Sequence, residues 1–266
     1  MPYIQVEPGV RLFYEIRGDG PPILFIHGWT MSHDVWEYLI PPLGKHFQTI
    51  VLDLRGNGDS DKPWGDYTYD VYARDIAAVV DTLHLRQATL VGWSLGAAIG
   101  AKYITHYGGG VEKFVSVAGA IPYFTSRPLI PFGPTRQDVH GWIEQEKRRR
   151  PEFTKKFVDS MFASSTQNYT KLWIWSLCMK TSWHVAVRSL KTLRDTDMLS
   201  VLPQITIPSA VFHGRFDSVV PIEFGQYTAS SLANCKLVEF NHSGHVPFIE
   251  ESDRFTKELT RFIVSH

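Results

Sequence analysis

The segment Gly92-Trp93-Ser94-Leu95-Gly96 constrains the fold of this chain more than any other part of its sequence. It follows the apolar run 88–91, which has the character of a buried strand, and precedes the run 97–107, which has the character of a helix. A strand passes directly into a helix only where the chain reverses within a few residues, and glycine lacks the side chain that would collide there. Such a turn holds the Ser94 hydroxyl clear of the sheet, so Ser94 is the candidate nucleophile.

Length and composition predict a soluble globular chain with a full core. It has 266 residues, 44% of them hydrophobic. Lysine and arginine together number 27, as do aspartate and glutamate, so no net charge attracts nucleic acid or an anionic membrane. No apolar run reaches the ~20 residues that span a bilayer, and no basic segment followed by an apolar one begins the sequence. We therefore expect a cytoplasmic protein without a nucleic-acid or membrane partner.

The two cysteines, Cys178 and Cys235, show neither the spacing of metal ligands nor that of a disulfide framework. We expect two buried thiols. The sequence implies no metal, nucleotide or organic cofactor.

Short apolar runs alternate with helical patterns, which predicts an α/β fold with a mostly parallel central sheet and helices on both faces. Apolar residues recur at helical spacing over 72–83 and 255–263, and Ser252 could cap the second of these helices. The expected strands are an antiparallel hairpin at 3–7 and 10–17, followed by 23–26, 49–54, 88–91, 113–117, 210–213 and 236–240.

The alternation breaks between Tyr123 and Pro203, where roughly 80 residues carry helical patterns and no convincing strand. We expect a helical cap at 123–203, inserted into a core formed by 1–122 and 204–266. Four tryptophans of this segment either form the core of the cap or line a pocket beneath it: Trp142, Trp173, Trp175 and Trp183.

The segment His27-Gly28-Trp29 follows the expected strand 23–26 and can present a backbone N–H toward Ser94. The N–H groups of Trp29 and Leu95 together would form an oxyanion hole, which stabilises the charge on a tetrahedral intermediate.

Asp217 and His245 each lie in a loop after an expected strand, where open α/β sheets bind their ligands. His245 can take the proton of Ser94 as general base, and Asp217 can orient the imidazole. Asp195 and Asp197 are alternative acids, but no strand precedes them. For His242 a structural or solvent-facing role is expected, because a metal pair of His242 and His245 lacks a third ligand nearby.

Together these blocks resemble those of α/β-hydrolase-fold serine hydrolases, in the same order and over essentially the whole chain. The short cap and the block 53–60, which is expected to form a structural turn, resemble the non-haem haloperoxidases and perhydrolase-like esterases. The segments 27–29, 92–96 and 245–248 also resemble the pimeloyl-carrier-protein methyl esterase group. Leu95 and Ala97 depart from the perhydrolase pattern, which usually has Met and Gly there, and this departure disfavours peracid chemistry without touching ester hydrolysis.

The resemblance implies a carboxylic ester hydrolase that acts on a small-molecule substrate through an acyl-enzyme on Ser94. Haloalkane dehalogenases and epoxide hydrolases carry Asp at the elbow, so Ser94 argues against both. A lactonase, for example of acyl-homoserine lactones, or a C–C bond hydrolase would use the same triad and stays open. A ligand-binding receptor that has kept the fold is the alternative from another class.

Trp29 and Trp93 flank the oxyanion donors and the nucleophile in the sequence. We expect at least one indole to line the substrate pocket and to shorten it on the acyl side, so that short acyl chains are preferred. The alternative is that both indoles pack in the core beneath the elbow.

A triad acts as a unit, so Ser94→Ala and His245→Ala should each lower kcat by on the order of 10⁶, with little further loss in the double mutant. An organophosphonate should label Ser94, which intact-protein and peptide mass spectrometry would detect. Additive losses, or an adduct on another serine, would contradict the assignment.

Overall fold

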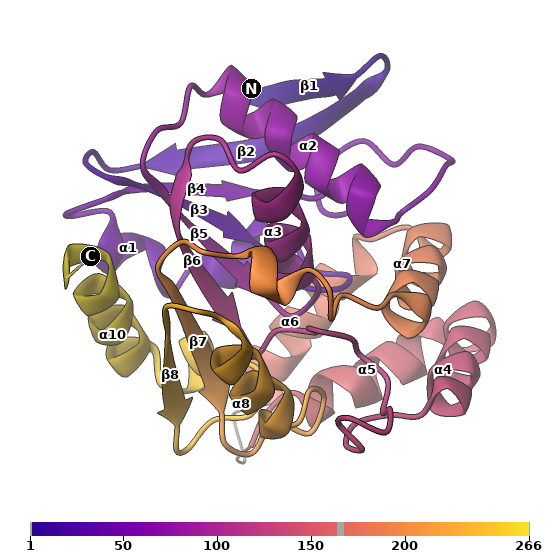
Figure 1. Cartoon of the computed structure of the whole chain (residues 1–266). Helices are drawn as coiled ribbons and strands as arrows, with labels where there is room; N and C mark the ends of the chain where they lie inside the picture. The colour runs from indigo at the N-terminus through magenta and orange to yellow at the C-terminus, as the bar shows by residue number, and fades with distance from the viewer. Residues whose placement is uncertain (1, 164–167, 266) are drawn as a thin grey trace.

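The computed structural model describes residues 2–163 and 168–265, and in them an 8-stranded sheet forms the centre of the molecule (Figure 1). The strand order is β1-β2-β4-β3-β5-β6-β7-β8. The strands are β1 (Tyr3–Glu7), β2 (Val10–Arg17), β3 (Pro22–Ile26), β4 (Gln48–Leu52), β5 (Ala88–Trp93), β6 (Val111–Val117), β7 (Ser209–Gly214) and β8 (Cys235–Phe240).

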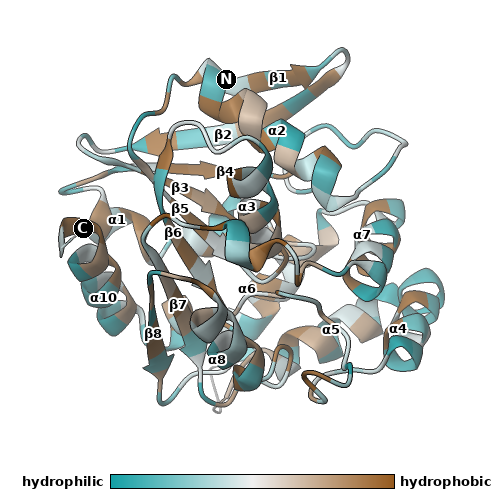
Figure 2. Ribbon diagram, in the orientation of Figure 1, coloured by the Kyte–Doolittle hydropathy of each residue, from teal (hydrophilic) through white to brown (hydrophobic). Residues whose placement is uncertain are grey.

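The sheet is antiparallel at one edge and parallel elsewhere. β1 pairs with β2 and β2 with β4 in antiparallel fashion, and all pairs from β4 to β8 are parallel. Phe25 in β3 lies opposite Val51 in β4 and Val91 in β5, and its side chain is fully buried. Figure 2 shows the central strands as the most hydrophobic part of the fold, as expected of strands covered on both faces.

Helices cover both faces of the sheet. Figure 1 shows α2, α3 and α8 on one face and α1 and α10 on the other. α2 is capped by the Thr68 hydroxyl, which accepts from the N–H of Val71 at 3.3 Å. The bounds are α1 (Ile40–Leu43), α2 (Tyr69–Thr82), α3 (Leu95–His106), α8 (Ile222–Ser231), α9 (Pro247–Glu250) and α10 (Ser252–Ser265), with the short 3₁₀ helices η1 (His33–Trp36) and η2 (Leu202–Gln204).

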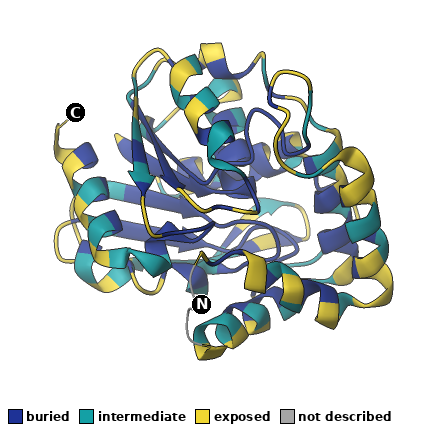
Figure 3. Cartoon of the chain, turned by 90° about the horizontal axis from the view of Figure 1, so that it is seen from below, coloured by how far each residue is buried: buried dark blue, intermediate teal, exposed yellow. Residues whose placement is uncertain are grey.

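Among the described residues of 123–203, four α-helices lie between β6 and β7 and no strand is added to the sheet. They are α4 (Arg136–Arg148), α5 (Arg150–Ser160), α6 (Asn168–Met179) and α7 (Trp183–Asp195). α4 begins with a capping box in which the side chains and backbones of Thr135 and Asp138 bind each other. Figure 3 shows the outer faces of helices exposed around a buried sheet. The division into core and cap stays a prediction, and we keep the name cap for residues 123–203.

Strand bounds agree with the sequence-based expectation to within two residues, with one informative difference at β4. The expected strand 49–54 ends instead at Leu52. The N–H of Asp53 still donates to the Phe13 carbonyl of β2 at 2.9 Å, but the N–H of Leu54 donates to a side chain instead, His27 Nε2, at 3.0 Å.

The expectation of two buried thiols is correct for Cys178 and wrong for Cys235, which is only half-buried at the start of the edge strand β8. Within the described ranges, no helix is both long and apolar enough to cross a bilayer.

A buried ion pair joins the block 53–60 to helix α2. Arg55 donates from Nε and Nη2 to the two carboxylate oxygens of Asp75 at 2.5 and 2.6 Å, and from Nη1 to Glu7 at 3.0 Å. The side chains of Arg55 and Asp75 are both almost fully buried. A bidentate pair of this kind fixes the direction in which the chain leaves β4.

Asp75→Asn should lower the free energy of unfolding by about 3 kcal/mol, because it leaves the Arg55 charge buried without its main partner. Urea denaturation would measure the change. Glu144→Gln serves as the control, since the Glu144–Lys147 pair lies on the surface, and it should leave the midpoint unchanged. Equal effects of the two substitutions would contradict the assigned role of the buried pair.

Candidate active site

Ser94 lies at the sharp turn between β5 and α3. Its φ of 55° is in the left-handed region, and its side chain is almost buried. The turn is tight enough that a Cβ at Gly92 would overlap the backbone of Gly96 and Ala97. A Cβ at Gly96 would overlap the carbonyls of Ile26 and His27, so α3 packs in backbone contact with the end of β3. The glycines therefore permit both the elbow and its approach to the segment that carries Trp29.

The turn after β3 is oriented by a neutral histidine. The imidazole of His27 donates from Nδ1 to the Gly28 carbonyl at 2.8 Å and accepts at Nε2 from the N–H of Leu54 at 3.0 Å. This pair of contacts requires the tautomer with the proton on Nδ1. Burial lowers the pKa of His27 to about 4, so the ring is neutral near pH 7.

The hydrogen bond from His27 to the Gly28 carbonyl also orients the N–H of Trp29. The two groups belong to one planar trans peptide and point in opposite directions. The second expected donor, the N–H of Leu95, belongs to the first residue of α3 and has no acceptor within the helix.

Asp217 and His245 lie together after β7 and β8. His245 donates from Nδ1 to Asp217 Oδ2 at 2.8 Å. The other carboxylate oxygen of Asp217 accepts from the N–H groups of Val219 and Val220, each at 2.9 Å. Because the carboxylate can only accept, His245 carries its proton on Nδ1, and its Nε2 is left with a lone pair that can accept a proton.

Asp217 stays ionised although it is buried. Burial by itself raises the pKa of this carboxyl, but the charges and hydrogen bonds of His245 and His213 outweigh it and bring the pKa below the usual range.

His213 is a site residue that the sequence analysis missed. It is fully buried at the end of β7, and its Nε2 lies 2.8 Å from the Val220 carbonyl and 3.3 Å from Asp217 Oδ2. Its position at the end of the strand, four residues before Asp217, was the available signal. His242 is exposed, in agreement with its expected role outside the site.

The elbow is tied to the loop that carries His245 through Trp93. The Trp93 indole donates to the backbone carbonyl of His245 at 2.8 Å, and the two rings lie 5.4 Å apart. The same indole packs edge-on against Trp36 and Phe248 and is 1% exposed. The expectation that Trp93 lines the substrate pocket is therefore wrong: its side chain packs in the core, against Trp36 and Phe248.

Trp29 points toward the cap. Its indole donates to the Ala186 carbonyl in α7 at 3.0 Å, and its ring contacts Phe157 and Phe153 of α5 at centroid distances of 5.0 and 6.4 Å.

The two phenylalanines of α5 also line a pocket of about 320 Å³. Trp142, which packs against Phe153, forms a third aromatic wall, and Ser218 and Val219 from the Asp217 loop form the opposite side. Of the residues that line the pocket, Phe153 and Phe157 thus contact Trp29, and Val219 contacts Asp217.

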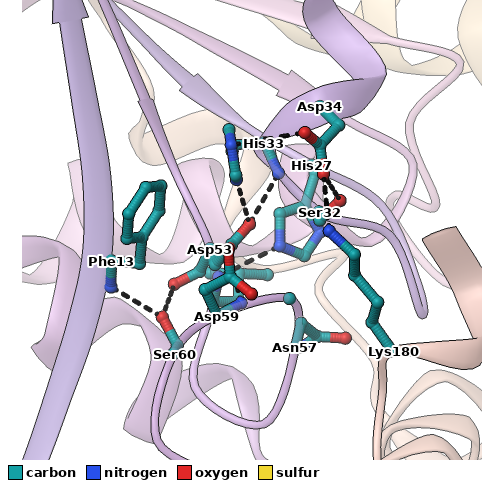
Figure 4. A network of polar contacts seen from close by, with 12 residues as sticks. Phe13, His27, Ser32, His33, Asp34, Asp53, Asn57, Asp59, Ser60 and Lys180 are labelled. Atoms are coloured by element: carbon teal, nitrogen blue, oxygen red, sulfur yellow. Dashed lines mark hydrogen bonds and ion pairs between the residues drawn. The ribbon is translucent and has the colours of Figure 1, made fainter.

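Asp53 holds the structural turn expected at 53–60 (Figure 4). Its Oδ1 accepts from the backbone N–H and the Nδ1 of His33 at 2.6 and 2.9 Å, and its Oδ2 accepts from the N–H of Asp59 at 2.7 Å. From the cap, Lys180 reaches Asp34 at 3.3 Å on the neighbouring segment. This network connects the cap, the turn 53–60 and the chain that follows Trp29.

The alternative acids lie on the cap surface with basic partners. Asp195 pairs with Arg136 and Arg194 at 2.6 and 2.7 Å, and Asp197 pairs with Arg127.

A family model described as the alpha/beta hydrolase fold matches residues 21–252. The chain belongs to this family. It is 37% identical to the AB hydrolase superfamily protein YisY of Bacillus subtilis, with 98% of each chain covered, and 30% identical to a non-heme haloperoxidase of Rhodococcus erythropolis over the full length of both. The solved esterase EaEST from Exiguobacterium antarcticum superposes with a TM-score of 0.96 at 33% identity, with 98% of each chain covered.

The prediction of the α/β-hydrolase fold is confirmed, as is the resemblance to the haloperoxidase and esterase groups. Both agree with the expectation of a carboxylic ester hydrolase.

Asp217→Asn should preserve the fold and lower kcat by about 10⁴, because the amide favours the wrong tautomer of His245. Steady-state hydrolysis of an activated ester, with circular dichroism to verify folding, would measure the effect. Asp195→Asn and Asp197→Asn are matched controls and should change kcat little. A strong loss in either control, with an active Asp217→Asn enzyme, would show that the acid is misassigned.

Proposed function

We propose that this protein hydrolyses small carboxylic esters through an acyl-enzyme on Ser94. The observation that carries the proposal is the buried hydrogen bond from His245 Nδ1 to Asp217. The indole of Trp93, which is adjacent to Ser94 in the elbow, donates to the backbone of His245 and so connects the His245 loop to the elbow. The family match and the esterase of similar structure support the same reaction class.

In the first half-reaction, the hydroxyl oxygen of Ser94 attacks the ester carbonyl while Nε2 of His245 takes the hydroxyl proton. The carbonyl oxygen becomes an oxyanion that accepts from the N–H groups of Trp29 and Leu95. Asp217 stabilises the imidazolium through its bond to Nδ1.

When the tetrahedral intermediate collapses, His245 gives the proton to the leaving alkoxide and an alcohol departs. In the second half-reaction a water molecule attacks the acyl-enzyme carbonyl, and His245 takes the proton of the water. The proton returns to Ser94 as the carboxylic acid leaves, so the enzyme ends in its starting state.

The pocket between the cap helices α4 and α5 and the Asp217 loop suits the apolar part of such a substrate. Of its aromatic walls, Phe153 and Phe157 contact the indole of Trp29, and Trp142 packs against Phe153. Each methylene that fits such a surface gains up to ~0.8 kcal/mol, but one that collides with a rigid ring costs more than it gains. We therefore propose a preference for short acyl chains, and we assign it to the indole of Trp29 and not to that of Trp93.

The cellular setting of this activity is also a proposal. We propose a cytoplasmic enzyme whose partners are small molecules. The even balance of charge gives no net field that would attract nucleic acid or an anionic membrane.

Trp29→Ala should shift the optimum of kcat/KM toward longer acyl groups, because it removes the indole that packs against two pocket-lining side chains, Phe153 and Phe157. The measurement compares acetate to octanoate esters of one alcohol, with lactones of matching length included and Ser94→Ala as the inactive control. Trp93→Phe is the matched control, and it should lower activity on all esters by a similar factor. A shifted profile in Trp93→Phe alone would reverse the two roles, and higher kcat/KM for lactones than for esters would make the enzyme a lactonase.

A further inference from the structure

The turn that carries the oxyanion donor is strained. The N–H of Met31 donates to the Gly28 carbonyl at 3.3 Å, which closes a turn with Trp29 and Thr30 at its centre. Thr30 has a φ of 58°, a left-handed conformation that is unfavourable for a β-branched residue. Its hydroxyl donates to the Trp29 carbonyl at 2.7 Å. Strain of this kind persists only where surrounding contacts hold the chain in place.

The cap supplies such contacts from the connection between α6 and α7. The hydroxyl of Thr181 lies 3.1 Å from the Thr30 carbonyl, and the Thr181 side chain is buried. Five residues further on, the Ala186 carbonyl accepts from the Trp29 indole at 3.0 Å. One short stretch of the cap therefore binds both central residues of the turn.

Thr181 is itself held by a buried ion pair of the cap. Arg150 donates from Nη2 to the carbonyls of Cys178 and Thr181 at 2.9 and 2.5 Å, where α6 ends and its last carbonyls lack partners within the helix. The Nε of Arg150 lies 2.8 Å from the carboxylate of Glu146, which is buried. The positive charge of Arg150 also interacts favourably with the partial negative charge at the C-terminal end of α6.

We propose that Thr181 is a positioning residue for the oxyanion hole. This inference rests on the proposed function, because it concerns how the N–H of Trp29 is aimed. The hydroxyl of Thr181 holds the Thr30 carbonyl, and that carbonyl shares a rigid peptide plane with the N–H of Met31. This N–H binds the Gly28 carbonyl, which shares its own peptide plane with the N–H of Trp29.

Two planes joined by one hydrogen bond thus connect a cap side chain to the oxyanion donor. His27 holds the second plane from the core side, at the same Gly28 carbonyl. The donor is therefore aimed correctly only while the cap is seated on the turn.

A competing acceptor makes the proposal testable. Asn57 Oδ1 lies 2.9 Å from the same Thr181 hydroxyl, which has only one proton to donate. If that proton served Asn57 alone, loss of the hydroxyl would affect stability without affecting the oxyanion hole.

The experiment compares Thr181→Val, which removes the hydroxyl at nearly constant volume, with Thr181→Ser, which keeps it. The matched control is Thr192→Val, since the Thr192 hydroxyl also donates from the cap to a core carbonyl, that of Tyr67, at 2.9 Å. Each variant is assayed for kcat and KM on one short-chain ester, for inhibition by a trifluoromethyl ketone, which forms an oxyanion on the nucleophile, and for Tm.

Thr181→Val should lower kcat and the affinity for the trifluoromethyl ketone by about tenfold each, with KM within about twofold of the parent, because the lost interaction acts on the oxyanion. Thr181→Ser should recover most of both quantities, and Thr192→Val should retain them even where its Tm falls.

Equal kinetics for Thr181→Val and Thr192→Val would overturn the inference and leave the proposed function standing. A parent protein that neither hydrolyses esters nor is labelled on Ser94 would overturn the proposed function, and the positioning role with it.

Discussion

The candidate site depends on the close approach of two backbones, which the missing side chain of Gly96 permits. At this position α3 lies against the carbonyls of Ile26 and His27, where any Cβ would overlap. The contact brings the elbow of Ser94 and the turn after β3 together at the carboxyl ends of the two central strands, β3 and β5. In the proposed mechanism, two backbone donors from segments far apart in the sequence then face one oxyanion, without the entropy cost of ordering a side chain at the moment of reaction.

The loops of Trp29, Asp217 and His245 are also bound by the cap. The N–H of His245 donates to the Met161 carbonyl at 2.7 Å, and Ser218, beside Asp217, donates to the Ser160 carbonyl at 2.8 Å. The turn of Trp29 and Thr30 is bound from α7 and from the connection that precedes it. The cap therefore provides hydrogen-bond partners for backbone and side-chain groups of the loops that carry the candidate site residues. Preorganisation of this kind lets a site on loops keep a fixed geometry.

Sequence patterns predicted those parts of the fold that local rules govern. The β-rich runs and the glycines of the elbow determine the conformation of short segments of a few residues each. The structure places the corresponding strands and turn close to where they were expected. Asp217 and His245 were expected at strand ends, and the structure brings them within hydrogen-bond distance. The expectation that the Trp93 indole lines the substrate pocket was wrong, because adjacency to Ser94 in the sequence carries no information on which side of the elbow a side chain faces.

The sequence by itself determined the order of strands and helices, the position of the elbow and the identity of the candidate triad, because each depends on residue types at short spacings. Only the tertiary structure decided which partners those residues meet. Thr181 and Thr30, which contact each other in the folded chain, are 151 residues apart in the sequence. His213 and Asp217 are neighbours in the sequence, but both become buried only when the surrounding elements pack around them. The pKa of His27 and that of Asp217 follow from the same cause, since burial and neighbouring charge exist only once the loops have packed.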